Sequence, residues 1–262
     1  MAQPNVLILR APGTNCDRET AYAFEAAGAG VEVLHINSVL ENPAQFGNFQ
    51  ILCIPGGFSY GDDVAAGRIL ANQIQHHLYA ELTRFKEDGK LILGICNGFQ
   101  VLIKSGVLLD NDPEYGPPAT LTWNDSGQFE DRWVQLGVEP SDCVFLRGID
   151  SMYLPVAHAE GKFVTRDDRV LSRLDGGRQL VLRYRLQTEA IVGEGKVPYP
   201  DNPNGSMANV AGLSDKTGRV LGLMPHPERH IDRTHHPRWT RGEGRQPGDG
   251  MPMFLNAVNY FA

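Results

Sequence analysis

Short apolar runs alternate with helix-like stretches along the first part of the chain. The runs lie at residues 5–9, 31–35, 50–54 and 91–95. Such runs, bounded by loop residues, are typical of buried strands. Between them, residues 18–27 predict a helix with Asp17 as its N-cap, and residues 67–86 predict a long helix that ends at Gly89. Strand, helix and strand with short connections predict a parallel sheet with helices on both faces.

The hydrophobic pattern changes after Gly106. Residues 110–118 are rich in Asp, Asn and Pro and predict a loop. Alternating short strands follow at residues 119–123, 133–139, 153–158 and 180–186. Their alternation predicts an antiparallel lobe over one side of the site. A last apolar run at 220–224 predicts another buried strand, and residues 253–261 predict a closing helix.

A cysteine lies where strand 91–95 passes into a helix-like run. The sequence is GICNGFQ at residues 94–100, with Cys96 between two glycines. This is the strand–turn–helix context of a nucleophile elbow, with Cys in place of the usual Ser. Because the turn is sharp, its flanking positions favour residues without a Cβ, and the first N–H groups and the dipole of the helix favour a thiolate. The alternative is a buried structural cysteine between two packing glycines.

Two glycines follow strand 50–54, in the segment PGG at residues 55–57. Glycines at a strand end let backbone N–H groups point outward without a Cβ in the way, as an oxyanion hole or an anion nest requires. A plain tight turn is the alternative for this segment.

Strand 220–224 delivers His226 and Glu228, within PHPE at residues 225–228. A thiol is only partly ionised at neutral pH, so a nucleophilic cysteine needs a base beside it. A histidine fits this role, and a carboxylate on its other ring nitrogen fixes its tautomer and orientation. Alternatively, the two side chains belong to a surface turn and are solvated.

The other three cysteines lack the elbow context. Cys16 lies in the first loop, at the carboxyl edge of a strand where ligands bind, and is a rival nucleophile. Cys53 lies within a predicted strand and is expected in the core, and Cys143 lies in a strand-like run. The four cysteines form no C-x-x-C pair, which argues against a zinc site or a disulfide framework and for a reducing compartment. We therefore expect a cytoplasmic location.

Composition agrees with a globular enzyme. The chain has 262 residues, 42% of them apolar and 21% charged, enough for a full core. The net charge of −7 gives no support to a nucleic-acid or anionic-membrane partner. We find neither a stretch long and apolar enough to span a bilayer nor a signal-peptide pattern.

The predicted organisation is a single domain over 1–262 with a loop insertion near 231–250. This segment is rich in His, Arg and Gly and has little apolar periodicity. Its histidines lack the accompanying ligands of a metal site. We expect a mobile or partner-ordered loop here.

Together, the stretches 55–57, 94–100 and 226–228 resemble the motifs of class I (triad) glutamine amidotransferases. The resemblance implies an α/β fold, a flavodoxin-like three-layer sandwich with a mostly parallel central sheet and a small antiparallel extension. It also implies a glutamine site without a metal. The implied roles are nucleophile for Cys96, base and acid for His226, orienting carboxylate for Glu228, oxyanion N–H donors for Gly57 and Asn97, and glutamine-pocket lining for Gln100.

Seven motifs narrow the resemblance to one branch of this family. They are PGTNCDRE at 12–19, GGFSYGD at 56–62, GICNGFQ at 94–100, NDSGQF at 124–129, HAEGK at 158–162, NPNGS at 202–206 and MPHPER at 224–229. They resemble those of glutaminase subunits that supply ammonia to an ATP-dependent synthetase subunit in de novo purine biosynthesis, often through a small third subunit. The implied product of that synthetase is the amidine of formylglycinamide ribonucleotide. Because the chain has no phosphate-binding G-x-x-x-x-G-K-[ST] loop, we expect ATP and Mg²⁺ on the partner and no cofactor in this chain.

Two other functions remain open from the residues alone. A cysteine peptidase or another hydrolase uses the same kind of elbow, since such turns recur with unrelated chemistries. A binding or regulatory subunit that kept the fold and lost activity is the non-enzymatic alternative.

Overall fold

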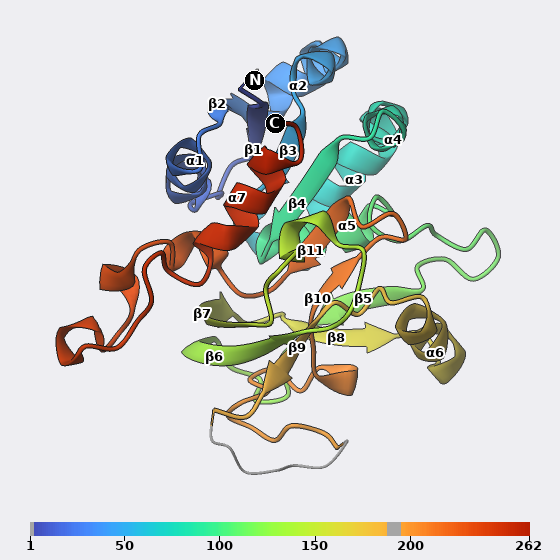
Figure 1. Cartoon of the computed structure of the whole chain (residues 1–262). Helices are drawn as coiled ribbons and strands as arrows, with labels where there is room; N and C mark the ends of the chain where they lie inside the picture. The colour runs from blue at the N-terminus through green and yellow to red at the C-terminus, as the bar shows by residue number, and fades with distance from the viewer. Residues whose placement is uncertain (1–2, 188–194) are drawn as a thin grey trace.

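A nine-stranded sheet runs through the whole molecule, in the order β2-β1-β3-β4-β11-β10-β9-β6-β7 (Figure 1). The computed structural model describes residues 3–187 and 195–262. Residues 1–2 and 188–194 of the predicted 1–262 domain lie outside the described residues. The strands are β1 Asn5–Arg10, β2 Gly30–His35, β3 Ile51–Ile54, β4 Leu91–Ile95, β5 Ala119–Thr122, β6 Glu130–Val138, β7 Ser151–His158, β8 Lys162–Thr165, β9 Leu182–Arg185, β10 Val210–Ser214 and β11 Val220–Leu223.

Five neighbouring strands, from β2 to β11, are parallel. β3 and β4 are buried along their whole length, as the continuous apolar runs predict. The register pairs Leu223 of β11 with Ile95 of β4. Because both strands end at one edge of the sheet, the residues that follow them, Cys96 and His226, are delivered to the same place.

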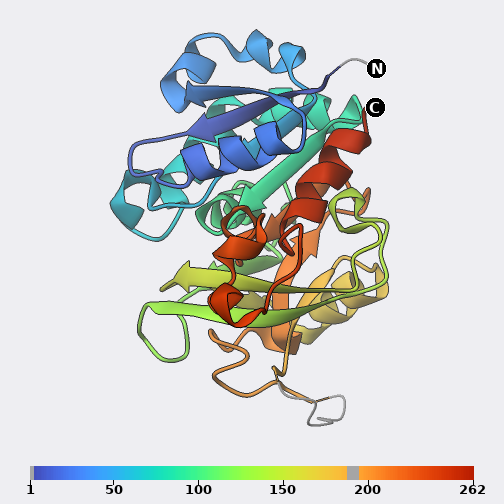
Figure 2. The same ribbon diagram turned by 60° about the vertical axis from the view of Figure 1, so that its left-hand side comes forward.

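Helices cover both faces of the parallel part, which gives the predicted three layers (Figures 1 and 2). The helices are α1 Asp17–Ala26, α2 Ile36–Glu41, α3 Arg68–His77, α4 Tyr79–Glu87, α5 Asn97–Lys104, α6 Asp168–Gly176 and α7 Met251–Asn259. On one face α7 packs against α1, where the rings of Phe24 and Phe254 meet edge to face with centroids 4.9 Å apart. On the other face α3 packs against α5. The fold class expected from the sequence is confirmed.

The antiparallel strands differ from the predicted lobe. β10 pairs antiparallel with β11, and β9, β6 and β7 continue from it, so these strands extend the main sheet. Only β5 and β8 form a separate two-stranded sheet among the described residues. The sequence prediction missed β8, β10 and α6. β10 contains Gly212 and follows a turn-rich loop, so its local pattern is weak.

Three local predictions were wrong. The helix predicted over 67–86 is two helices, because Leu78 leaves helical geometry with φ of −128° while its side chain stays fully buried. Asp17 does not cap α1; Cys16 holds that position, and its carbonyl accepts from the backbone N–H of Thr20 at 3.0 Å. Cys143 precedes a short 3-10 turn and lies outside any strand.

The 231–250 segment packs against β6 and β7. It contains two 3-10 turns, Arg233–His235 and Trp239–Arg241, and lies at the lower left of Figure 1. The ring of His236 is 5.5 Å from that of Tyr153, and the Tyr153 N–H donates to the Asp249 carboxylate at 2.8 Å. These contacts hold the segment on the sheet; the expectation was a mobile or partner-ordered loop, and ordering by a partner stays a prediction. Among the described residues no helix is long and apolar enough to cross a membrane.

Candidate active site

Cys96 lies on the turn between β4 and α5, with φ of 50° and ψ of −104°. A non-glycine residue in this left-handed region is strained by about 1–3 kcal/mol. Two backbone hydrogen bonds hold it: Cys96 N–H donates to the Leu223 carbonyl at 2.8 Å, and Gln100 N–H donates to the Cys96 carbonyl at 3.1 Å. Gly98 brings α5 so close to β3 that a Cβ there would lie 1.8 Å from the Ile54 carbonyl oxygen. The turn has the geometry of an elbow, and its backbone requires glycine at position 98.

The Cys96 thiol is buried at the N-terminal end of α5. Cys96 is 5% exposed, and its Sγ lies 3.6 Å from the Ala157 carbonyl oxygen. Asn97 is the first residue of α5, so its N–H belongs to the helical turn whose donors have no intrahelical acceptor. This end of a helix carries positive partial charge, which stabilises a thiolate.

His226 and Glu228 form a buried pair just beyond β11. Nδ1 of His226 lies 2.6 Å from Oε1 of Glu228, and each residue is 2% exposed. The backbone N–H of His226 donates to the Pro155 carbonyl at 2.8 Å, which ties the pair to β7. Nε2 of His226 has no hydrogen-bond partner among the described residues. It is therefore free to exchange a proton with the thiol or with a substrate.

The electrostatics of this pair favour a charged imidazole. Burial alone would lower the pKa of His226, but the Glu228 carboxylate, with Cys96 and Cys16 nearby, raises this pKa well above its ordinary value. An imidazolium beside Cys96 stabilises the thiolate form of the nucleophile.

The N–H groups of Gly57 and Asn97, which are expected to bind an oxyanion, lie in two segments that the Asn97 side chain joins. Gly57 has φ of 139°, and a Cβ there would meet the Asn15 backbone nitrogen at 2.7 Å. The Asn97 side chain accepts a hydrogen bond from the Ser59 N–H at 3.2 Å, two residues beyond Gly57. This bond fixes the Gly57 segment relative to the first turn of α5.

Gln100 is buried beneath the elbow. Its Oε1 accepts from Asn97 Nδ2 at 2.9 Å, and its Nε2 donates to the Glu160 carbonyl at 2.5 Å. Both ends of its amide are thus engaged within the protein. Its expected contact with glutamine stays a prediction.

Cys16, the rival nucleophile, also lies against His226. Its Sγ and ligand atoms of Glu19, His226 and Glu228 all lie within 4.8 Å of one another, a grouping that is also compatible with a metal ion. The Arg229 guanidinium donates to Cys16 Sγ at 3.2 Å and to Glu19 at 2.9 Å. A positive charge therefore already lies beside the carboxylates of this cluster. Burial raises the pKa of Cys16 to about 11. Sequence reasoning missed this proximity because the contact joins residues from opposite ends of the chain.

Three polar loops named by the sequence motifs meet beside the elbow. Asn124 is buried, and its Nδ2 donates to the His158 carbonyl at 2.8 Å. Asn204 Nδ2 donates to the Gly161 carbonyl at 2.9 Å, and the Phe163 N–H donates to Ser206 Oγ at 2.9 Å. Burial lowers the pKa of His158 to about 3, so this imidazole is neutral. Asn124, His158 and Gly161 are thus buried in a hydrogen-bonded cluster, whereas residues 125–129 are exposed.

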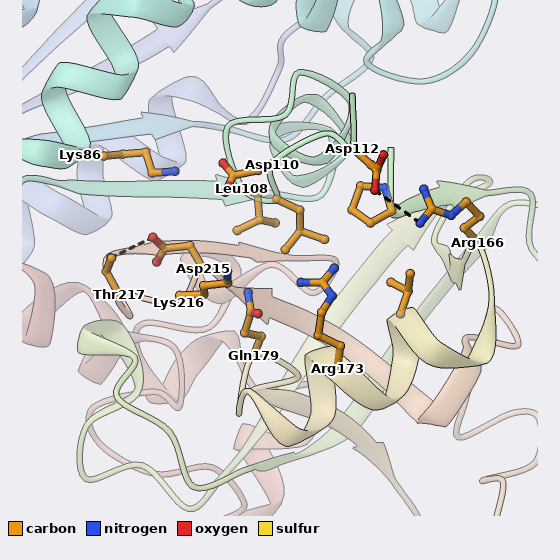
Figure 3. A pocket seen from close by; sticks show the side chains of 13 residues that line it. Lys86, Leu108, Asp110, Asp112, Arg166, Arg173, Gln179, Asp215, Lys216 and Thr217 are labelled. Carbon is orange, nitrogen blue, oxygen red and sulfur yellow. Dashed lines mark hydrogen bonds and ion pairs between the residues drawn. The ribbon is translucent and has the colours of Figure 1, made fainter. Parts of the chain in front are cut away.

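A cavity of about 390 Å³ lies away from the elbow, near the amino ends of β4 and β11 (Figure 3). Figure 3 shows Arg173 and Lys216 beside it, with Arg166 close to Asp112. None of the six predicted site residues lines this cavity. The cavity is therefore separate from these six residues.

The fold and the site define a glutamine amidotransferase of the triad class. A family model described as a CobB/CobQ-like glutamine amidotransferase domain matches residues 3–261, and the chain belongs to that family.

Similar proteins narrow the assignment. A protein of Dehalococcoides mccartyi named phosphoribosylformylglycinamidine synthase subunit PurQ is 48% identical over 99% of this chain and 98% of its own length. A PurQ subunit of Methanococcus maripaludis is 40% identical over 98% and 97%. The solved structure of PurLQS from Thermotoga maritima matches with a TM-score of 0.73 and 30% identity, covering 100% of both chains. The chain is therefore a member of the PurQ family, and the function expected from the sequence, glutaminase subunit of this synthase, is confirmed.

Proposed function

We propose that Cys96, His226 and Glu228 carry out glutamine hydrolysis and that the ammonia passes to a synthetase partner. The observation that carries this proposal is the meeting of two strand ends: the strained elbow of Cys96 after β4 and the buried His226–Glu228 pair after β11. A nucleophile, its base and an orienting carboxylate on adjacent strands are the parts that acyl transfer requires.

In the first step the Cys96 thiolate attacks the side-chain carbonyl carbon of glutamine. The C=O π electrons move to oxygen, and the N–H groups of Gly57 and Asn97 stabilise this oxyanion. When the tetrahedral intermediate collapses, the C–N bond breaks and the His226 imidazolium protonates the leaving nitrogen. Ammonia and a glutamyl thioester on Cys96 result.

In the second step water cleaves the thioester. His226, now neutral, takes a proton from water as the oxygen attacks the thioester carbon. The C–S bond breaks, glutamate leaves, and the thiolate–imidazolium pair is restored. Glu228 keeps Nδ1 of His226 protonated throughout, so Nε2 alone exchanges protons.

We further propose that PurL is the synthetase partner and PurS the small third subunit, since the T. maritima structure is titled PurLQS. PurL would bind ATP and Mg²⁺ and use the ammonia to convert formylglycinamide ribonucleotide into its amidine. This chain would need no cofactor of its own, and the expected location stays the cytoplasm.

The test is glutamate release from glutamine, measured with the chain alone and with PurL, PurS, ATP and formylglycinamide ribonucleotide. Strong stimulation by the full mixture is expected if docking completes the site. Equal rates in both would indicate a free-standing glutaminase, and no release in either would overturn the proposal.

A further inference from the structure

The loop between β3 and α3 has an unusual backbone. Tyr60 and Asp62 each have φ of 55°, Gly61 has 69° and Val64 has 70°. Such values are uncommon for non-glycine residues and rarest for a β-branched side chain. A strained loop persists only where surrounding contacts over-determine it, and it often serves a site. Gly57, one of the two proposed oxyanion donors, lies in the same loop.

One end of a buried polar network holds the loop to the nucleophile helix. Asn97, 3% exposed, donates from Nδ2 to the Asp62 carboxylate at 3.1 Å and to Gln100 at 2.9 Å, while its Oδ1 accepts from Ser59 N–H. Both hydrogens of the Asn97 amide are therefore used. The Asp62 carboxylate supplies the acceptor that lies on the strained loop.

The other end of the network anchors the same loop to the β7–β8 turn. The Glu160 carboxylate, in a residue 8% exposed, accepts from the Ala66 N–H at 3.2 and 3.3 Å and lies 3.8 Å from Lys104 Nζ. Lys104 Nζ donates to the Ala66 carbonyl at 2.6 Å. Burial and the neighbouring Glu160 raise the pKa of Asp62 to about 6, so Asp62 is still mainly ionised at neutral pH.

We propose that Asp62 is a positioning residue for the oxyanion hole. Its carboxylate holds the Asn97 side chain, and that side chain holds Ser59, so the N–H groups of Gly57 and Asn97 keep a fixed separation. Loss of the carboxylate releases the loop without touching the thiol or the His226–Glu228 pair. The inference deepens the proposed function and rests on it.

Asp62 also suits its left-handed backbone, since Asp tolerates φ near +55° better than most residues. The test separates this backbone role from the hydrogen bond. Asp62→Gly keeps the conformational freedom and removes the carboxylate. Asp62→Asn keeps an oxygen acceptor for Asn97. Asp63→Gly changes an exposed neighbour and is the matched control.

Two rates are measured for each variant in the complex with PurL and PurS. Glutamate release forms an oxyanion, whereas alkylation of Cys96 by iodoacetamide does not. For Asp62→Gly we expect kcat for glutamate release to fall about 10–100-fold with KM nearly unchanged, because the donors act mainly in the transition state. Alkylation should stay within about twofold of wild type, because thiolate formation is untouched. Asp62→Asn should recover most of the turnover, and Asp63→Gly should match wild type.

A second variant guards against misfolding of the loop. Asn97→Ala removes the other partner of the same hydrogen bond and leaves residues 60–64 intact. It should show the same loss of kcat with retained alkylation, and the double variant should lose little more than either single variant, as coupled residues do.

Wild-type turnover in Asp62→Gly, a parallel loss of alkylation, or equal losses in Asp62→Asn and Asp62→Gly would each overturn the positioning role. The proposed function is judged separately, by wild type against Cys96→Ala. If wild type releases no glutamate, both proposals fall; if wild type is active and Asp62→Gly is equally active, only this one does.

Discussion

Two buried thiols lie beside one imidazole in this protein, and they differ in almost everything else. Cys96 and Cys16 both stand at the N-cap of a helix, and both contribute to the raised pKa of His226. Cys96 has the strained backbone of an elbow, with φ of 50°, whereas Cys16 has φ of −97°. Cys16 receives a hydrogen bond from Arg229, yet burial raises its pKa to about 11.

If the proposed roles hold, the comparison implies that a helix terminus and a nearby histidine do not suffice to make a nucleophile. What distinguishes Cys96 is its strained turn, with the N–H groups of Gly57 and Asn97 as the proposed donors in two different segments. In the proposed mechanism these donors bind the charge that the reaction creates, and charge stabilisation of this kind is usually the largest contribution to catalysis. The predictions below separate the two thiols.

The largest effect is expected for Cys96→Ala. Glutamine-dependent synthesis by the assembled complex should fall at least about 10³-fold, because no other group is placed to form the thioester. Ammonia-dependent synthesis should persist, since it bypasses this site. Both activities are measured with PurL and PurS, and Cys143→Ala, a buried cysteine elsewhere, is the control. Retained glutamine-dependent activity would falsify the assignment of Cys96.

His226→Ala should lower kcat for glutamate release almost as far as Cys96→Ala. The variant removes the imidazole that is proposed to exchange protons with the thiol and the leaving nitrogen. Glu228→Ala should be roughly tenfold to a hundredfold less damaging, because it orients the ring and transfers no proton. Steady-state kinetics on both variants checks the division. Equal losses would contradict it.

The two thiols should differ in their rates of alkylation and in how these rates depend on pH. At pH 8 a thiol with a pKa of about 11 is ionised only to about one part in a thousand, so iodoacetamide should label Cys96 well before Cys16. The Cys16 pKa is raised, so its thiolate fraction, and its labelling in Cys96→Ala, should rise about tenfold for each pH unit between 7 and 9. Mass spectrometry of the two peptides measures this. Equal labelling at pH 7 would remove the distinction.

The smallest effect is expected for Cys16→Ser. Glu228 still orients His226, and the serine hydroxyl can accept the Arg229 hydrogen bond. We expect kcat to change less than about threefold and the free energy of unfolding to fall by about 1 kcal/mol, because a buried apolar sulfur is replaced by a hydroxyl. Turnover and urea unfolding test this, and a loss comparable to that of Cys96→Ala would make Cys16 part of the chemistry.

The parallel half of the sheet was predictable from sequence because its signals are local. The apolar runs at 5–9, 50–54 and 91–95 lie close to β1, β3 and β4. The break of the long helix at Leu78 was not predictable, since a buried leucine suits either form and tertiary packing decides.

For the site, too, local sequence signals were informative and contacts between distant segments were not. Cys96, His226 and Glu228 stand in motifs whose neighbours reveal their chemistry. The contacts of Cys16 with Arg229 and of Asp62 with Asn97 join segments distant in sequence, and nothing in the local pattern points to them. Sequence reasoning therefore proposed the reacting groups, and it missed the contacts that join them to distant segments.

The neighbouring positions of β4 and β11 have a consequence for protein synthesis. A ribosome translates Cys96 long before His226, with the whole antiparallel part of the chain between them. A nascent chain that has emerged only as far as α6 carries the elbow but lacks His226, the proposed base, so we expect it not to hydrolyse glutamine. The proposed triad is thus complete only after β11 has inserted beside β4.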